Sequence, residues 1–175
     1  MAARERAPKA GWWVLPVVAV VALALDQWTK YLVVSNLELY ESWAPFPALA
    51  NLFTIHHVTN TGAAFGLFRN GSLVFAVVAI VVSVVIVLYY RHLPDGQWLV
   101  RLSLGLQLAG ALGNLIDRVR VGHVIDFLDV QVWPVFNLAD ASIVCGVILL
   151  AYLLLREERQ GSRKLESPDG AECTG

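Results

Sequence analysis

Two aspartates at the edges of apolar segments are the residues best suited to chemistry. Asp126 stands between Ile125 and Phe127, surroundings that favour a protonated carboxyl. Asp140 follows Asn137 by three residues, which matches a capping box at a helix start, where the helix dipole favours a negative charge. Two carboxyls that share one proton can activate water and polarise a carbonyl, as in aspartyl peptidases. The simpler interpretations are a loop aspartate for Asp126 and a plain helix cap for Asp140.

Further polar residues stand inside or beside apolar runs, where an ionisable group costs about 2.5–3.5 kcal/mol to insert into a membrane. Asp26 and Lys30 are four residues apart and would share a helix face. They form either a functional pair or a self-neutralising pair that reaches the outer interface. Asn114 and Arg118 have the same spacing at the end of another apolar run. A plain helix-end cap is the alternative for this second cluster.

No other catalytic constellation competes with the aspartates. Ser103 and Ser142 lack a paired base, and the sequence contains no H-E-x-x-H motif. The two cysteines, Cys145 and Cys173, have no metal-type spacing. We therefore expect neither a metal nor a cofactor. The net charge of −1 gives no electrostatic indication of nucleic-acid binding.

The composition predicts a membrane protein that can position these residues. Hydrophobic residues make up 57% of the chain and charged residues only 15%, whereas a soluble domain is about one quarter charged. Four apolar runs approach the roughly 20 residues that a membrane-spanning helix needs. We therefore predict an all-α polytopic membrane protein with four transmembrane helices, at about residues 11–34, 72–90, 98–116 and 138–155. The first run could instead be a signal peptide, because basic residues precede it and Ala22-Leu23-Ala24 resembles a cleavage site.

Basic residues predict the orientation of these helices, because short cytoplasmic loops carry an excess of lysine and arginine. Nine of the thirteen basic residues fall on one side: Arg4, Arg6, Lys9, Arg91, Arg101, Arg156, Arg159, Arg163 and Lys164. Both termini are then cytoplasmic, and residues 35–71 and 117–137 face outside. Residues 52–58 predict a short strand in the first outer loop. Residues 1–160 would form one transmembrane domain, followed by a disordered cytoplasmic tail at 161–175.

Five motifs, in their order along the chain, resemble those of the lipoprotein signal peptidase (signal peptidase II) family. The resemblance covers nearly the whole chain, from about residue 12 to 156, and the motifs stand at residues 26–30, 60–65, 113–118, 124–127 and 136–140. The resemblance implies four transmembrane helices with cytoplasmic termini, a small extracytoplasmic β-cradle and a catalytic aspartate pair. By match to the motifs, that pair is Asp126 and Asp140. The other matched residues would bind substrate or order the site: Asn60, Asn114, Arg118, Asn137, Asp26 and Lys30.

The resemblance also implies an activity and its surroundings. The family removes signal peptides from prolipoproteins and cuts before the diacylglyceryl-modified cysteine. The expected partners are lipidated prolipoproteins and membrane lipids, and we expect a monomer. The expected location is the bacterial inner or plasma membrane, with the active site at the extracytoplasmic face.

Two other classes of protein remain as alternatives. In a small proton-coupled transporter, Asp26 or Asp140 would relay protons, but transporter sites lie near the midplane of the membrane, and the acidic residues here gather toward one face. A non-catalytic membrane scaffold gives no reason for polar residues at four helix ends. The depth of the carboxyls discriminates between these classes, since two carboxyls meeting near one interface favour the peptidase.

Overall fold

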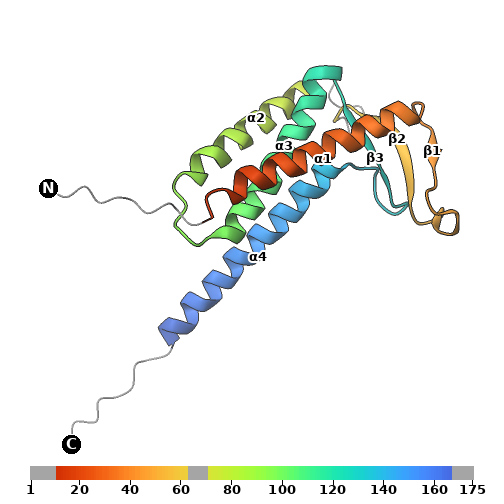
Figure 1. Ribbon diagram of the computed structural model, residues 1–175. Helices are drawn as coiled ribbons and strands as arrows, with labels where there is room; N and C mark the ends of the chain where they lie inside the picture. The colour runs from red at the N-terminus through yellow and green to blue at the C-terminus, as the bar shows by residue number, and fades with distance from the viewer. Residues whose placement is uncertain (1–10, 63–70, 167–175) are drawn as a thin grey trace, which may run out of the picture.

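Four long helices form the body of the molecule. The computed structural model describes residues 11–62 and 71–166, so the tight turn that the sequence predicts at residues 60–66 lies outside the described residues after residue 62. The helices are α1 (Val14–Asn36), α2 (Gly71–Tyr90), α3 (Trp98–Val121) and α4 (Leu138–Glu166), shown in Figure 1. Each contains a stretch long and apolar enough to cross a membrane. The predicted set of four spans is confirmed.

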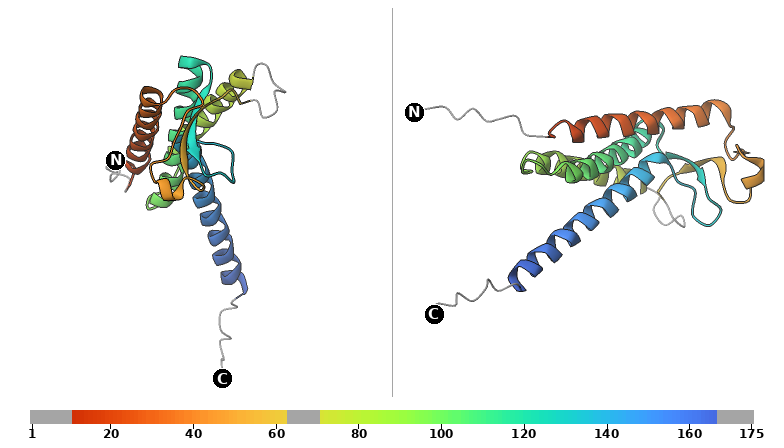
Figure 2. Two further views of the ribbon diagram at one scale, coloured as in Figure 1. Left: turned by 90° about the vertical axis from the view of Figure 1, so that its right-hand side faces the viewer. Right: turned by 60° about the horizontal axis from the view of Figure 1, so that its bottom comes forward.

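A small antiparallel sheet lies at one end of the helices. Its strands are β1 (Ser42–Trp43), β2 (Thr54–Asn60) and β3 (Val124–Asp129), in the order β1-β2-β3. A short 3-10 helix, η1 (Pro47–Leu49), lies between β1 and β2. Figure 2 shows the sheet beside the end of α1 and the start of α4, with the α2–α3 connection at the opposite end. The predicted cradle is confirmed, although β2 lies two residues later than the strand expected at 52–58.

Helix α3 is the centre of the bundle and packs against the three other helices. Two of its glycines allow this close approach, as is common where helices meet in lipid. A Cβ atom at Gly105 would lie 3.0 Å from the carbonyl oxygen of Leu15 in α1. A Cβ at Gly110 would overlap the carbonyl of Ala139 in α4. These contacts bring the polar ends of α1, α3 and α4 together.

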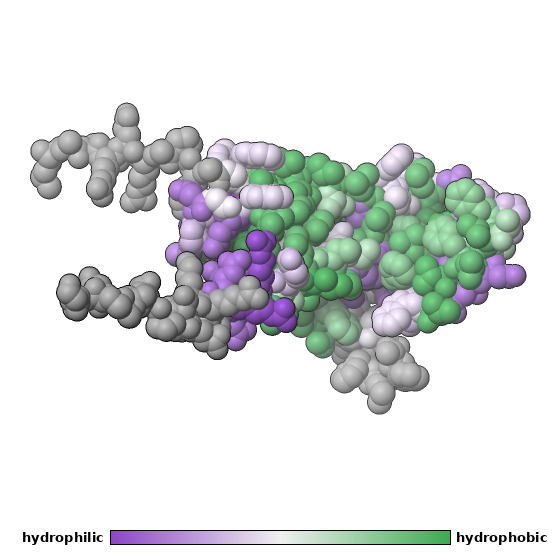
Figure 3. All heavy atoms as spheres, turned by 90° about the horizontal axis from the view of Figure 1, so that it is seen from below, coloured by the Kyte–Doolittle hydropathy of each residue, from purple (hydrophilic) through white to green (hydrophobic). Residues whose placement is uncertain are grey.

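The outer surface of the bundle is apolar. Large hydrophobic side chains of α1, α2 and α4 are exposed along most of their length. In Figure 3 a hydrophobic band covers the middle of the visible face, with hydrophilic residues toward the two ends. An exposed apolar surface of this extent matches a lipid-facing protein.

Two helices extend beyond the apolar runs that predicted them. The apolar run that predicted α3 ends at residue 116, but the helix continues to Val121. It ends there because Gly122 adopts a φ of 81° and its amide donates to the carbonyl of Arg118 at 3.1 Å, which is a common helix C-terminus. Helix α4 continues past residue 155 to Glu166, since the arginines and glutamates there favour a helix. The first residues of the tail that we expected to be disordered are therefore helical. Residues 167–175 lie outside the described part.

Candidate active site

The start of α4 holds Asp140 in a fixed position. The Asp140 amide donates to Oδ1 of Asn137 at 2.9 Å, and the Asn137 amide donates to Oδ2 of Asp140 at 3.4 Å. This is the reciprocal pattern of a capping box. The next free amide of the first turn, that of Ala139, donates to Oδ1 of Asp26 at 2.9 Å. Asp26 in α1 therefore anchors the helix end that carries Asp140.

Asp126 on β3 is buried, with 1% of its surface exposed. Its Oδ2 accepts a hydrogen bond from Nδ2 of Asn60 at 2.8 Å, and its Oδ1 accepts one from Nδ2 of Asn137 at 2.6 Å. The amide of Gly62 donates to Oδ1 of Asn60 at 2.8 Å. Because that oxygen is occupied, the nitrogen of the Asn60 side chain is the end that faces Asp126.

Two side-chain amides connect the carboxyls. Nδ2 of Asn114 donates to Oδ1 of Asp140 at 2.7 Å. Nδ2 of Asn137, which donates to Asp126, also donates to Oδ1 of Asn114 at 3.1 Å. The chain of contacts runs from Asp126 through Asn137 and Asn114 to Asp140. Carboxyls from two separate segments of the sequence thus belong to one hydrogen-bond network.

A buried ion cluster supports this network from α1. The Nζ of Lys30 lies 2.9 Å from Oδ2 of Asp26, 2.7 Å from Oδ2 of Asp117 and 3.1 Å from Oδ1 of Asn114. Lys30 is only 2% exposed. An ammonium group can only donate hydrogen bonds, so Asn114 turns its oxygen toward Lys30. Its nitrogen then faces Asp140, which makes Asp140 an acceptor.

Asp117 and Gln27 were not among the predicted site residues. Asp117 pairs with Lys30, accepts from Nε2 of Gln27 at 3.1 Å and accepts from the amide of Ile125 at 3.3 Å. It therefore connects α1, α3 and β3. The sequence signal that could have identified Asp117 was the balance of charge within the spans, where Lys30 stands against two aspartates, Asp26 and Asp117.

Arg118 lies beside the network and contacts it through a backbone carbonyl and not through a side chain. Its guanidinium donates to the backbone carbonyl of Asn114 at 3.2 Å and lies 5.3 Å from the ring centroid of Phe75 in α2. Its Nε is buried and has no hydrogen-bond partner among the described residues. Its charge interacts with those of Asp126 and Asp140. A cation with a spare donor therefore stands next to the two carboxyls.

Most of the predicted site residues meet at one place. Seven of the eight form a continuous side-chain network, and Arg118 adjoins it through the backbone of Asn114. The seven are Asp126, Asp140, Asn60, Asn114, Asn137, Asp26 and Lys30. Asp26 and Lys30 are almost fully buried, which fits an ordering role better than contact with substrate. The carboxyls of Asp126 and Asp140 belong to the sheet end of the bundle and not to its middle.

The surroundings of Asp126 alter its acidity. Burial raises the pKa of this carboxyl to about 6, and the charge of Asp140 raises it as well. Hydrogen bonds from Asn60 and Asn137 and the charge of Lys30 oppose the rise. Asp140 is only partly buried. One carboxyl is thus shielded and holds its proton up to a higher pH, while the other is accessible to water.

Comparison with protein families supports what this geometry indicates. The profile described as "Signal peptidase (SPase) II" matches residues 18–156. The chain belongs to this family. Similar proteins include the lipoprotein signal peptidase of Moorella thermoacetica, 50% identical over 138 residues, which are 79% of this chain and 90% of that protein. The lipoprotein signal peptidase of Geobacter metallireducens is 44% identical over 162 residues, 89% of this chain and 98% of that protein.

Solved structures of bacterial membrane enzymes have the same fold. A chain titled as a bacterial membrane enzyme superposes with a TM-score of 0.78 at 30% identity, covering 88% of this chain and 94% of the other. A second chain with a similar title gives a TM-score of 0.77 at 30% identity, covering 86% and 98%. The protein is a multi-pass protein of a bacterial membrane and an aspartic peptidase. The transporter and scaffold alternatives are excluded.

Proposed function

We propose that Asp126 and Asp140 are the catalytic pair with which this protein removes signal peptides from prolipoproteins, cutting before the diacylglyceryl-modified cysteine. The observation that carries the proposal is the shared network: a carboxyl on β3 and a carboxyl on α4 are connected through the side-chain amides of Asn137 and Asn114, which are hydrogen-bonded to each other. Amides that orient both carboxyls allow one water molecule and one carbonyl to be placed between them. The names of the relatives support the substrate class.

The two carboxyls take different roles in this mechanism. Asp140 begins as the ionised partner, because it accepts hydrogen bonds from Asn114 and from the Asn137 amide in the first turn of α4. It removes a proton from water as the oxygen attacks the scissile carbonyl. The shielded Asp126 begins protonated and donates its proton to the carbonyl oxygen. When the tetrahedral intermediate collapses, the proton held by Asp140 passes to the leaving amine and Asp126 is reprotonated from the hydroxyl.

The remaining residues hold this arrangement or the substrate. Asn60, Asn114 and Asn137 fix the two carboxyls through the amides described above. Lys30 and Asp26 act from within the bundle, where substrate does not reach. Arg118 is the candidate for binding a backbone carbonyl of the substrate, since its Nε has no partner among the described residues. We expect a monomer, because one chain supplies this whole set of residues.

The sheet end of the bundle should face the outside. The opposite end carries the predicted excess of basic residues, including Arg91 in the α2–α3 connection and Arg156 and Arg159 on α4. Reporter fusions at residue 60 and at the C-terminus should report opposite sides of the membrane, with residue 60 outside. Reports from the same side would contradict this orientation.

A cleavage assay tests the proposed substrate directly. We expect the purified protein to cut a synthetic peptide that carries a diacylglyceryl-modified cysteine and to leave the same peptide with a free cysteine intact. Mass spectrometry of the products should show the modified cysteine as the new N-terminus. A cut at another bond, or equal cleavage of the two peptides, would contradict the proposal.

The acidity of Asp126 gives a separate prediction. Asp140→Asn should lower the pKa of Asp126 below about 6, because the repulsion by Asp140 disappears while the burial remains. Asn60→Ala should raise it, because a donor to the ionised carboxylate is lost. Infrared spectroscopy of the protonated carboxyl band measures both shifts, with Asp126→Asn as the blank that removes the band. Shifts in the opposite directions would contradict the assignment of the shared proton.

The same pKa predicts how stability and activity depend on pH. The folded protein binds the Asp126 proton more tightly than the unfolded chain, so the contribution of this group to stability falls as pH rises from about 3.8 to about 6. Above about 6 the free enzyme loses that proton, and kcat/KM should fall with rising pH. The corresponding fall in kcat should occur at a higher pH than the fall in kcat/KM, because bound substrate removes water from the site and favours the neutral carboxyl.

A further inference from the structure

Gln107 is the one polar side chain between Leu104 and Leu112 in the membrane-spanning part of α3. Its side chain is half-buried, and its Nε2 is covered and has no hydrogen-bond partner among the described residues. A bilayer offers no water to such a donor, and a buried amide without a partner is costly. An unsatisfied amide at this depth indicates a partner that the free protein does not supply.

Gln107 continues a polar line that leads to the catalytic network. Gln107, Asn114 and Arg118 are separated by seven and four residues, so they lie within about 20° of one another around the helix. Asn114 donates to Asp140, and Gln107 lies two turns, about 10 Å, from it toward the end that we expect to be cytoplasmic. A peptide that follows this line inward from the carboxyls would pass Gln107.

The polar line faces a gap between α2 and α4. Gln107 stands on α3 about 60° from Gly110 on one side and about 60° from Leu104 on the other. Gly110 packs against Ala139 of α4, and Leu104 belongs to the same buried cluster as Ile86 of α2. Among the described residues, no Cα atom of α2 lies within 8 Å of one of α4, and the two helices lie on different flanks of α3 (Figure 1). The two helices therefore flank the polar line without meeting over it.

A signal peptide that is cut at the carboxyls presents acceptors along this line. Water reaches the scissile carbonyl only where the peptide is extended, because a helix keeps its carbonyls hydrogen-bonded. Carbonyls of an extended segment in lipid have no partner of their own. The N-terminal part of a signal peptide is basic and stays on the cytoplasmic side. Because an extended chain advances about 3.3 Å per residue, the carbonyl near Gln107 belongs to a residue about three positions before the scissile bond.

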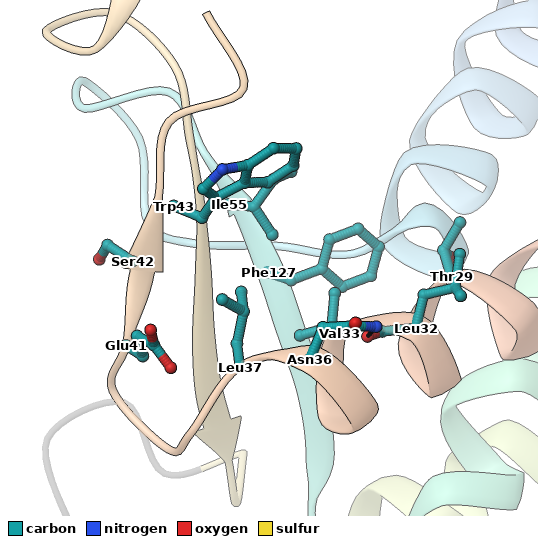
Figure 4. A pocket seen from close by; sticks show the side chains of 10 residues that line it. All are labelled: Thr29, Leu32, Val33, Asn36, Leu37, Glu41, Ser42, Trp43, Ile55 and Phe127. Atoms are coloured by element: carbon teal, nitrogen blue, oxygen red, sulfur yellow. Dashed lines mark hydrogen bonds between the residues drawn. The ribbon is translucent and has the colours of Figure 1, made fainter. Parts of the chain in front are cut away.

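This position differs from the cavity of about 610 Å³ between α1 and the sheet. The side chains that line the cavity come from α1, from the connection after it and from the three strands, as Figure 4 shows. None of these lining residues belongs to α2, α3 or α4. A peptide along the polar line is therefore bound by residues outside the cavity.

We propose that Gln107 binds the signal peptide of the substrate, with its Nε2 donating a hydrogen bond to a main-chain carbonyl about three residues before the scissile bond. The inference rests on the proposed function and adds to it a contact with the part of the substrate inside the membrane. The last torsion of a glutamine side chain has broad wells, so Nε2 can turn from its covered position toward a peptide in the gap. A main-chain acceptor is present in every sequence, so this contact suits substrates with different signal peptides.

Gln107→Met should have opposite effects on stability and on substrate binding. Methionine has nearly the length of glutamine and no amide, so the thermal unfolding temperature in detergent should rise by about 2–4 °C. For a lipidated peptide with a complete signal sequence, KM should rise about fivefold with kcat little changed, because one hydrogen bond is lost from substrate and transition state alike. The matched control is Gln97→Met, the same exchange at the start of α3, where the side chain makes no capping hydrogen bond. This control should change neither value.

A change in the substrate identifies the acceptor. Replacing one peptide bond by a trans-alkene removes its carbonyl and keeps its shape. Alkenes placed two, three and four residues before the scissile bond should raise KM about fivefold at one of these positions for the unsubstituted enzyme. For Gln107→Met the same alkene should cause no further rise, because the two changes remove the same hydrogen bond.

The outcomes separate this inference from the proposed function. If the unsubstituted enzyme does not cleave the lipidated peptide, the proposed function is wrong and the role of Gln107 with it. If it cleaves the peptide and Gln107→Met leaves KM unchanged, or each alkene raises KM equally for the variant and the unsubstituted enzyme, only the role of Gln107 is wrong. A lower unfolding temperature of Gln107→Met would show that the amide has a partner within the protein, and would also overturn the proposal.

Discussion

Replacement of Asp126 or Asp140 by asparagine should abolish cleavage of the lipidated peptide. An asparagine amide can neither take a proton from water nor give one to a carbonyl oxygen. A single acid or base group contributes about 10²–10⁴-fold to the rate, and the two groups act on the same transition state, so loss of either should cost at least about 10³-fold in kcat. Initial rates of peptide cleavage, measured with enough enzyme to detect a slow residual reaction, give this value.

The same two variants should remain folded, because asparagine has nearly the shape of aspartate and its oxygen can still accept one of the hydrogen bonds that each carboxylate accepts. Thermal unfolding in detergent should therefore stay within a few degrees of that of the unsubstituted protein. Asp129→Asn is the matched control on β3: Asp129 interacts with His56 and Gln131 at the surface and should be dispensable for cleavage. Substantial activity in either Asp126→Asn or Asp140→Asn would rule out the aspartyl mechanism.

The features that sequence predicted best are local ones. The capping box of Asn137 and Asp140 depends on a spacing of three residues, and the structure contains both of its hydrogen bonds. The pairing of Asp26 with Lys30 depends on a spacing of four, and it is present as well. Hydropathy located the four spans but placed the end of α3 too early, because Gly122 and not the loss of apolar residues stops that helix.

The features that sequence missed depend on how elements pack. The partner of Asp117 is Lys30 on another helix, and no local spacing in the sequence indicates that pairing. The order in which Asn114 and Asn137 connect the carboxyls requires the register between α3 and α4, which Gly110 sets through its contact with Ala139. The cavity between α1 and the sheet combines residues of α1 and all three strands, so no single segment carries its pattern.

The ion cluster around Lys30 leads to the second large effect. Lys30→Met should strongly destabilise the protein, because it leaves the carboxylates of Asp26 and Asp117 buried without a cation. Removing one partner of a buried ion pair costs about 3–5 kcal/mol. We expect a large drop in the thermal unfolding temperature and little cleavage. Lys30→Arg keeps the charge and should retain more stability than Lys30→Met, and equal stability of these two variants would contradict the role of the charge.

A double variant separates the effect on stability from the effect on the active site. In Lys30→Met/Asp117→Asn one of the two unpaired carboxylates is removed, while Asp26 keeps its hydrogen bonds from Ala139 and Gln27. Stability should therefore recover in part. Cleavage should not recover with it, because the oxygen of Asn114 then has only the donor from Asn137 and not the ammonium group of Lys30, so the amide that donates to Asp140 is held less firmly. We expect kcat to stay at least tenfold below that of the unsubstituted enzyme, with KM little changed. A stable double variant that cleaves at the full rate would show that Lys30 serves the fold alone, and that the carboxyls keep their orientation without it.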